Sequence, residues 1–137
     1  MGAQVTFTWL GAVAVGGGAA IGAWIRWGLG VLLNPVFPTL PLGTLAANLA
    51  GGLLMGAAME IITRTTQMSP ELRLLMTTGF LGGLTTFSTF SGEITGLLLR
   101  GEILWSAIGI AVHVAGSIVM TILGILLVRA LVAAVLA

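Results

Sequence analysis

The densest group of polar residues in this chain lies inside an otherwise apolar stretch, between Thr77 and Glu93. Adjacent glycines at 82 and 83 precede a run of Thr and Ser residues, and both features weaken a continuous helix. A break near residues 82–86 would turn backbone carbonyl oxygens out of the helical ladder, where they can bind a small hard cation. The alternative is a bent, continuous helix whose hydroxyls bond to carbonyls four residues earlier, and the pattern leaves both open.

Two aromatic residues follow the expected break. Phe87 and Phe90 are three positions apart, so on a helix they share a face with Glu93. Such pairs commonly pack against other helices or against lipid. The ring edge carries the positive part of the aromatic quadrupole, so edges that line a dehydrated passage could instead favour a small anion without trapping it. The spacing is compatible with packing or with an anion path.

Polar residues recur at helical spacing in two further apolar stretches. Thr44 and Asn48 are four positions apart, and His113, Ser117 and Thr121 follow the same interval. Hydroxyl and amide groups donate hydrogen bonds without adding fixed charge. Taken singly, such residues usually join one membrane helix to another. Together with a broken third helix, they suggest a track that solvates a small ion.

Three ionisable residues lie within the apolar stretches, where such groups are costly and therefore candidates for function. Arg26, flanked by Trp24 and Trp27, either extends to the membrane interface or forms a positive vestibule that gathers anions. Glu93 either faces a pore or pairs with a donor near a helix end. His113 has no second His or carboxylate at metal-ligand spacing, so no metal site is predicted there.

The composition places these residues in a membrane protein. Of 137 residues, 58% are hydrophobic and only 7% are charged, whereas a soluble domain carries about 25% charged residues. The net charge of +1 argues against a nucleic-acid binder, and the absence of cysteine from the sequence removes disulfides and thiolate chemistry. An enzyme is not expected, because the spans contain no nucleophile paired with a base and no metal-binding cluster.

The charged residues divide the chain into four stretches long enough to cross a bilayer, which takes about 20 apolar residues of helix. The predicted fold is all-α, a single four-helix membrane domain over residues 1–137. Its spans are predicted at about 9–33, 42–62, 71–99 and 103–131. The third helix is predicted to break near the middle of the membrane.

The orientation of the chain in the membrane is weakly specified. Arg64, Arg73 and Arg129 belong to one side, and Arg26 and Arg100 belong to the other. This near balance suits insertion in both orientations, as in a two-fold antiparallel dimer. If Arg26 lies within its helix it does not count, and an ordinary bias remains. The charges alone leave both interpretations open.

Four helices of minimal length form a bundle whose interior is filled by side chains, so a pore must lie between subunits or along a groove. Glycines four residues apart allow close helix packing at positions 18/22, 52/56, 79/83 and 92/96. These pairs could serve contacts within one chain or between two chains.

Two of these stretches resemble motifs of the Fluc (CrcB) family of fluoride channels, and the likeness covers nearly the whole chain. The segment Gly43-Thr-Leu-Ala-Ala-Asn-Leu-Ala-Gly51 resembles the second-helix motif GTLxxNxxG. The segment from 79 to 91, followed by Glu93, is similar to the most diagnostic stretch of the family. The first-helix signature is matched less completely, since Ala19 replaces a usual glycine, and His113 is not a residue expected from the family.

The resemblance implies a dual-topology homodimer, in which two antiparallel subunits form two fluoride pathways around one structural sodium ion that is not transported. It assigns the sodium to main-chain carbonyls of Gly82 and Thr85. The fluoride pathway would comprise the pore residues Asn48, Phe87 and Phe90, the polar track of Thr44, Glu93, Ser117 and Thr121, and Arg26 near an aqueous vestibule. The implied function is passive export of cytoplasmic fluoride across the cell (inner) membrane, which reduces fluoride toxicity.

Two other functions compete with this expectation. A small multidrug-resistance-like, proton-coupled exporter is also a four-helix antiparallel dimer, but it needs a carboxylate in its first helix, where this chain has only Arg26. A non-conducting assembly subunit would explain the glycines and aliphatic residues, yet it gives no reason for Asn48 or for the Thr- and Ser-rich break. Fluoride is strongly hydrated and needs donors that replace water along a tight path, and the polar residues meet that requirement.

Overall fold

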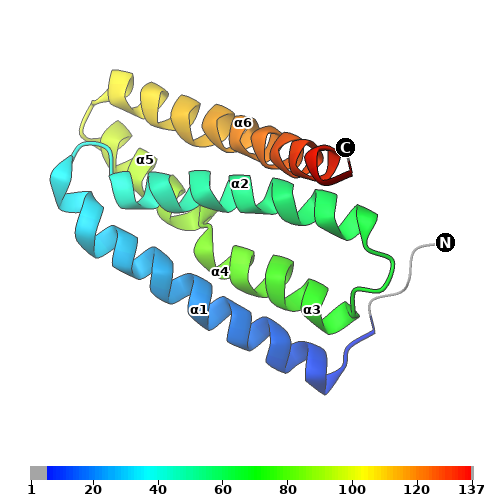
Figure 1. Cartoon of the computed structure of the whole chain (residues 1–137). Coiled ribbons are helices and arrows are strands. Elements are labelled where there is room, and N and C mark those ends of the chain that lie inside the picture. Colours follow the sequence, from blue (N-terminus) through cyan, green and yellow to red (C-terminus); the bar gives the residue numbers. More distant parts are fainter. Residues whose placement is uncertain (1–5, 137) are drawn as a thin grey trace.

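The computed structural model describes residues 6–136, which are helical apart from short connections and contain no strand (Figure 1). The first passage is α1 (Trp9–Leu33), which a short 3-10 turn, η1 (Asn34–Val36), connects to α2 (Leu42–Arg64). The third passage is divided into α3 (Pro70–Leu74), the π-helical η2 (Leu75–Leu81), α4 (Gly82–Leu84) and α5 (Phe87–Leu99). The last passage is α6 (Ile103–Leu136). The predicted domain also includes residues 1–5 and 137, which lie outside the described part.

The four passages form an up-and-down bundle (Figure 1). The connections at residues 34–41 and 100–102 lie at one end of the bundle, and the connection at 65–69 lies at the other. The most extensive helix contacts join α2 to α6 and α1 to η2. The broken passage therefore packs against α1 with its first half and approaches α2 and α6 with its second half.

The helices α1, α2 and α6 are each long and apolar enough to cross a membrane. The third passage falls short of that length as a single helix because it is divided. Four helical passages agree with the predicted fold class. Two helices end later than predicted: α2 continues to Arg64, and α6 continues to Leu136 through an aliphatic stretch without Gly or Pro that could end it.

Side-chain caps explain where several helices begin. The hydroxyl of Thr8 accepts from the Gly11 N–H at 3.0 Å at the start of α1. Ser69 accepts from the Leu72 N–H at 3.2 Å at the start of α3, with Pro70 in the first turn. Hydroxyl caps of this kind satisfy N–H groups that have no helical partner. The Ser69-Pro70 pair therefore starts α3.

The glycine pairs bring backbones together within one chain. A Cβ at Gly22 of α1 would meet the Phe80 carbonyl and lie 2.6 Å from the Leu84 nitrogen, and the pair at 79/83 faces α1 in the same way. A Cβ at Gly52 of α2 would lie 2.8 Å from the Ser117 carbonyl of α6. The pair at 92/96 differs, because a Cβ at position 92 meets nothing within 4 Å in the described part of the chain. Close packing thus fixes α1 on the broken passage and α2 on α6.

An ion-pair cluster joins the far ends of α2 and α6. The carboxylate of Glu60 lies 2.8 Å from Arg64 Nε and 3.1 Å from Arg129 Nε. Its side chain is only 9% exposed, whereas both arginines are about half exposed. These three charges are therefore paired with one another, away from the helix break.

Candidate functional site

The third passage is interrupted at two residues in extended conformation. Thr85 has φ −85° and ψ 154°, and Thr86 has φ −150° and ψ 115°. The N–H and hydroxyl of Thr85 both donate to the Leu81 carbonyl, at 3.0 and 2.8 Å, and so end the first half. The hydroxyl of Thr86 accepts from the Thr89 N–H at 3.1 Å and starts α5. The predicted interruption is present, and the alternative of a continuous bent helix is wrong.

Asn48 of α2 holds the extended segment through its side-chain amide. The Thr86 N–H donates to Asn48 Oδ1 at 2.8 Å, and Asn48 Nδ2 donates to the Thr86 carbonyl at 3.1 Å. This two-way exchange resembles the pairing of neighbouring residues in an antiparallel sheet. Both backbone groups of Thr86 are satisfied although it lies outside a helix, as backbone at membrane depth requires.

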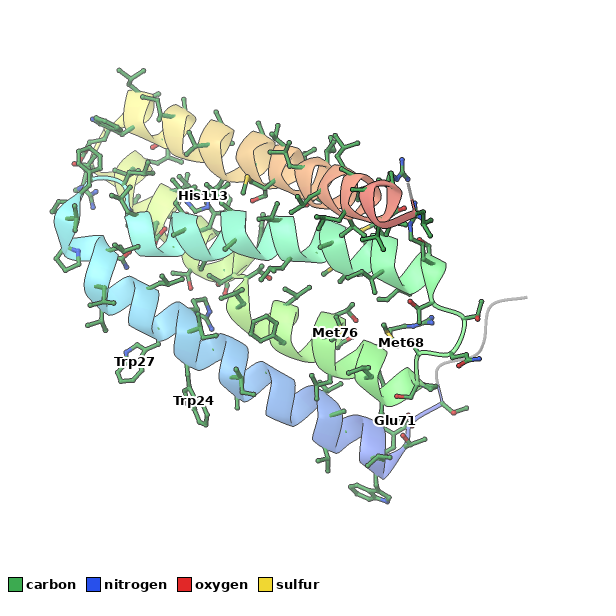
Figure 2. All side chains as sticks on the ribbon, viewed as in Figure 1. Trp24, Trp27, Met68, Glu71, Met76 and His113 are labelled. Atoms are coloured by element: carbon green, nitrogen blue, oxygen red, sulfur yellow. The ribbon has the colours of Figure 1, made fainter. Side chains whose placement is uncertain are left out.

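Arg26 of α1 contacts the other side of the break. Its Nε donates to the Gly83 carbonyl at 3.0 Å, in the last turn before the interruption. The carbonyl end of a helix carries a partial negative charge that a guanidinium stabilises. The flanking rings of Trp24 and Trp27 are 67% and 72% exposed and project away from the bundle (Figure 2). Arg26 is therefore directed at the break, whereas its tryptophan neighbours face outward.

The carbonyls of Gly82 and Thr85, on the two sides of Leu84 at the break, have no hydrogen-bond donor among residues 6–136. The N–H that would bond to the Gly82 carbonyl in a continuous helix belongs to Thr86, and it donates to Asn48 instead. The corresponding N–H for the Thr85 carbonyl belongs to Thr89, and it donates to the Thr86 cap. Neutral carbonyl oxygens are suitable ligands for a hard cation. The residues predicted to hold sodium thus have carbonyl oxygens that are available.

A groove of about 400 Å³ opens on the side of the bundle next to the break. It is lined by residues from α2, the extended segment, α5 and α6, and it includes five of the predicted pathway residues, Asn48, Phe87, Phe90, Ser117 and Thr121. The two phenyl rings are 5.5 Å apart between centroids. Phe87 is 76% exposed, whereas Phe90 is 7% exposed. The structure therefore brings these residues together on a surface that is open in the single chain.

His113 belongs to the same groove, although its residue type gave no prediction of a role. Its Nδ1 lies 3.1 Å from Asn48 Nδ2, and its ring lies 4.7 Å from that of Phe90 between centroids. The side chain lies within the bundle beside α2 (Figure 2) and is 4% exposed. The signal for this position was its spacing with Ser117 and Thr121, which the structure places on the same wall.

Thr44, Glu93 and Arg26 lie apart from the groove. The Thr44 hydroxyl donates to Glu93 Oε1 at 2.5 Å and so links α2 to α5. Glu93 lines a recess of about 490 Å³ near the 34–41 connection, and Thr44 and Arg26 line another of about 380 Å³. Thr86 borders both the groove and the Arg26 recess, so the break lies between these two spaces.

This architecture defines a multi-pass helical membrane protein whose polar site is built around a broken helix. Comparison with protein families gives a match to the model of CrcB-like protein, Camphor Resistance (CrcB), over residues 13–125. That range contains every predicted site residue, from Arg26 to Thr121. The chain belongs to the CrcB family, and the family resemblance seen in the sequence is confirmed.

Several curated relatives are similar over most of their length. A fluoride-specific ion channel FluC from Nitrosospira multiformis is 61% identical over 116 residues, which cover 85% of this chain and 91% of the relative. The corresponding protein of Aromatoleum aromaticum is 64% identical over 112 residues, covering 82% and 86%. That of Pseudomonas putida is 54% identical over 113 residues, covering 82% and 89%. These relatives are named as channels, and the expectation that this chain is not an enzyme is confirmed.

Proposed function

We propose that this chain forms a fluoride-selective channel through which cytoplasmic fluoride leaves passively, reducing fluoride toxicity. The observation that carries the proposal is the groove at the helix break, where hydroxyls, an amide and two phenyl rings meet without a charged lining residue. Family membership and the names of the relatives support the same ion.

The groove suits a small, strongly hydrated anion. The Ser117 hydroxyl can replace water without fixed charge, and the Thr121 hydroxyl, which donates to the Ser117 carbonyl at 2.9 Å, can do so when it rotates away from that carbonyl. The positive edges of Phe87 and Phe90 add a weak attraction. Weak binding by several neutral groups lets an ion leave again, whereas an ammonium or guanidinium would hold it. A tight passage between rings would exclude chloride, which is larger.

The two rival functions fit the structure less well. A proton-coupled exporter needs a carboxylate in the first helix, and α1 contains no acidic residue. Glu93, on α5, is bound to Thr44 and lies outside the groove. A non-conducting subunit would not need a helix break that leaves two carbonyls free. Passive conduction accounts for all of these features.

The Gly82 and Thr85 carbonyls are the proposed ligands of a structural sodium ion. A bound cation would supply positive potential close to the anion path. One chain contributes two oxygens, fewer than a hard cation takes, and residue 82 is exposed. A second copy of the chain could supply the remaining oxygens on a shared axis.

The proposed assembly is an antiparallel, dual-topology homodimer in the inner cell membrane. The groove is open in one chain, and the exposed Phe87 ring at its edge has an apolar surface for a second copy to cover. Because Arg26 lies within α1 and bonds to the break, Arg64, Arg73 and Arg129 at one end of the bundle are opposed only by Arg100 at the other, so the proposed insertion in both orientations rests on the family resemblance and not on the charges. Two copies would then enclose two equivalent paths.

Efflux from liposomes that contain only the purified protein tests the proposed function. Liposomes are loaded with the potassium salt of fluoride or of chloride. A potassium ionophore is added so that potassium can leave with the anion, and anion release is followed with ion-selective electrodes. We expect rapid fluoride release and negligible chloride release. Equal leakage of the two ions, or none of either, would reject a fluoride channel.

A further inference from the structure

The oxygen and both N–H groups of the Asn48 amide are engaged in hydrogen bonds. An asparagine side chain offers one acceptor oxygen and two N–H donors. The Thr86 N–H can only donate, so the amide atom 2.8 Å from it is the oxygen, and the nitrogen faces the Thr86 carbonyl and His113. One amide hydrogen goes to that carbonyl at 3.1 Å, and the other goes to His113 Nδ1 at 3.1 Å.

This arrangement determines the protonation state of His113. Because Asn48 Nδ2 can only donate, His113 Nδ1 must accept and carries no hydrogen. The neutral imidazole therefore carries its proton on Nε2, which is buried and has no hydrogen-bond partner in the described part of the chain. The ring is 4% exposed and lies against Phe90 at an interplanar angle of 32°, which restricts its rotation.

We propose that His113 is a positioning residue of the channel, whose Nδ1 holds the Asn48 amide in the orientation that keeps Thr86 extended. The inference rests on the proposed function and adds a role that residue type alone did not predict. Without an acceptor at this point, an amide hydrogen of Asn48 is left buried and unpaired, which is unfavourable. An amide that rotates away releases the Thr86 N–H, which can then bond to the Gly82 carbonyl and close the break.

Protonation of His113 would remove the contact. An imidazolium carries hydrogen on both nitrogens, so Nδ1–H would face the donor Asn48 Nδ2. The three elements around His113 carry few charged residues, namely Glu93 on α5, Glu60 and Arg64 on α2, and Arg129 on α6. Glu93 is bound to Thr44, and the other three form the distant ion-pair cluster. None of them has a hydrogen bond or ion pair with His113 in the described part of the chain.

Two variants whose side chains resemble each other in shape distinguish the loss of the hydrogen-bond acceptor from the loss of the imidazole ring. In His113→Asn, a side-chain oxygen can occupy the place of Nδ1, and the group does not titrate. In His113→Leu, the branching is the same but the acceptor is lost. We expect His113→Leu to lower fluoride efflux about tenfold, corresponding to one lost hydrogen bond. We expect His113→Asn to restore most of that loss.

The pH profile gives a readout that a merely structural side chain would not change. We expect efflux through the unaltered protein to fall once the pH is low enough to protonate this buried ring, because the imidazolium loses its contact with Asn48. The His113→Asn protein should show no such fall. Hydrofluoric acid crosses lipid by itself, so rates are corrected with protein-free liposomes at each pH. Wild-type efflux through His113→Leu, or the same acid loss in His113→Asn, would overturn the proposal.

Nitrogen NMR tests the contact without measuring transport. The sequence contains one histidine, so labelling with ¹⁵N-histidine reports this ring alone, in the unaltered protein in lipid. At about pH 7.5 we expect a proton on Nε2 and none on Nδ1. A proton on Nδ1 in a protein that conducts fluoride would overturn the role of His113 only. The expected spectrum in a protein that conducts no fluoride would overturn the proposed function instead.

Discussion

The Asn48 side chain forms hydrogen bonds with the backbone N–H and carbonyl of Thr86, as a neighbouring strand does with a residue in a sheet. It satisfies both backbone groups of Thr86 at 2.8 and 3.1 Å, and so removes the main cost of leaving the helix. By accepting from the Thr86 N–H it also leaves the Gly82 carbonyl without its helical donor. A single amide thereby connects the groove, the break and the proposed cation ligands.

The two phenylalanines should affect conduction alike and stability differently. We expect Phe87→Ile and Phe90→Ile each to suppress fluoride efflux, because both remove a ring edge from the groove. Phe90 is 7% exposed, so its replacement should cost about 1–2 kcal/mol of stability. Phe87 is 76% exposed in the single chain, so its replacement should leave the stability of that chain nearly unchanged, and any loss should come from the proposed contact with the second copy. Efflux assays test the expected effect on conduction, and thermal unfolding in detergent tests the expected effect on stability. Unaltered efflux in both variants would show that the two rings contribute to packing and not to conduction.

Among the elements, α1 packs most closely against the broken passage and fixes its position. Its glycines allow backbone contact with η2 and α4, and Arg26 lies one turn beyond Gly22 on the same face. The close approach of the two backbones brings the Arg26 guanidinium within hydrogen-bond distance of the Gly83 carbonyl. The position of the break relative to α1 is therefore set by glycine packing.

A pair of glycine substitutions in α1 tests this support. Gly22→Ala places a Cβ against the Phe80 carbonyl, so we expect a loss of about 1–3 kcal/mol in stability and reduced efflux. Gly17→Ala is the matched control in the same helix, because its Cβ would meet nothing within 4 Å in the described structure. The control should be neutral or slightly stabilising, since alanine favours helix. Thermal unfolding distinguishes them, and equal behaviour of the two variants would contradict the packing argument.

For the whole molecule, the proposed sodium site predicts dependence on sodium. The available carbonyls of Gly82 and Thr85 need a second chain to complete a cation site, so removing sodium should weaken the dimer as well as the conduction. We expect slower fluoride efflux and more monomer when an organic cation replaces sodium throughout purification and assay. Efflux follows conduction, and chemical cross-linking follows the dimer. A dimer and an efflux rate indifferent to sodium would remove this site from the proposal.

The proposed dual topology can be measured because the sequence contains no cysteine. Gln67→Cys introduces a single thiol in the exposed connection between α2 and α3. Membrane-impermeant thiol reagents should label this position from both sides of the membrane in comparable amounts, because an antiparallel dimer contains the two orientations of the chain in equal numbers. Labelling from one side alone would contradict an antiparallel dimer.

Much of the fold could be predicted because it depends on local composition. Apolar length predicted four helical passages, whereas the Gly-Gly pair with its following hydroxyl residues left a break and a bent helix both open, and the break was predicted together with the family resemblance. The π-helical turns of η2 were not predicted, since they depend on how that segment packs against α1. Thr44, Glu93 and Arg26 were predicted to belong to one fluoride pathway with the residues of the groove, but they line separate recesses. Spacing along one helix does not show which face a second helix covers.

The sequence by itself determined that this is a helical membrane protein of the CrcB family with an interruption in its third passage, because hydropathy, glycine content and motif are properties of short segments. Only the tertiary structure decided that Asn48 pairs with Thr86, that Arg26 binds Gly83 and that His113 contacts Asn48. The physical reason is that each contact joins residues at least 38 positions apart. Such contacts follow from how backbones approach one another in three dimensions.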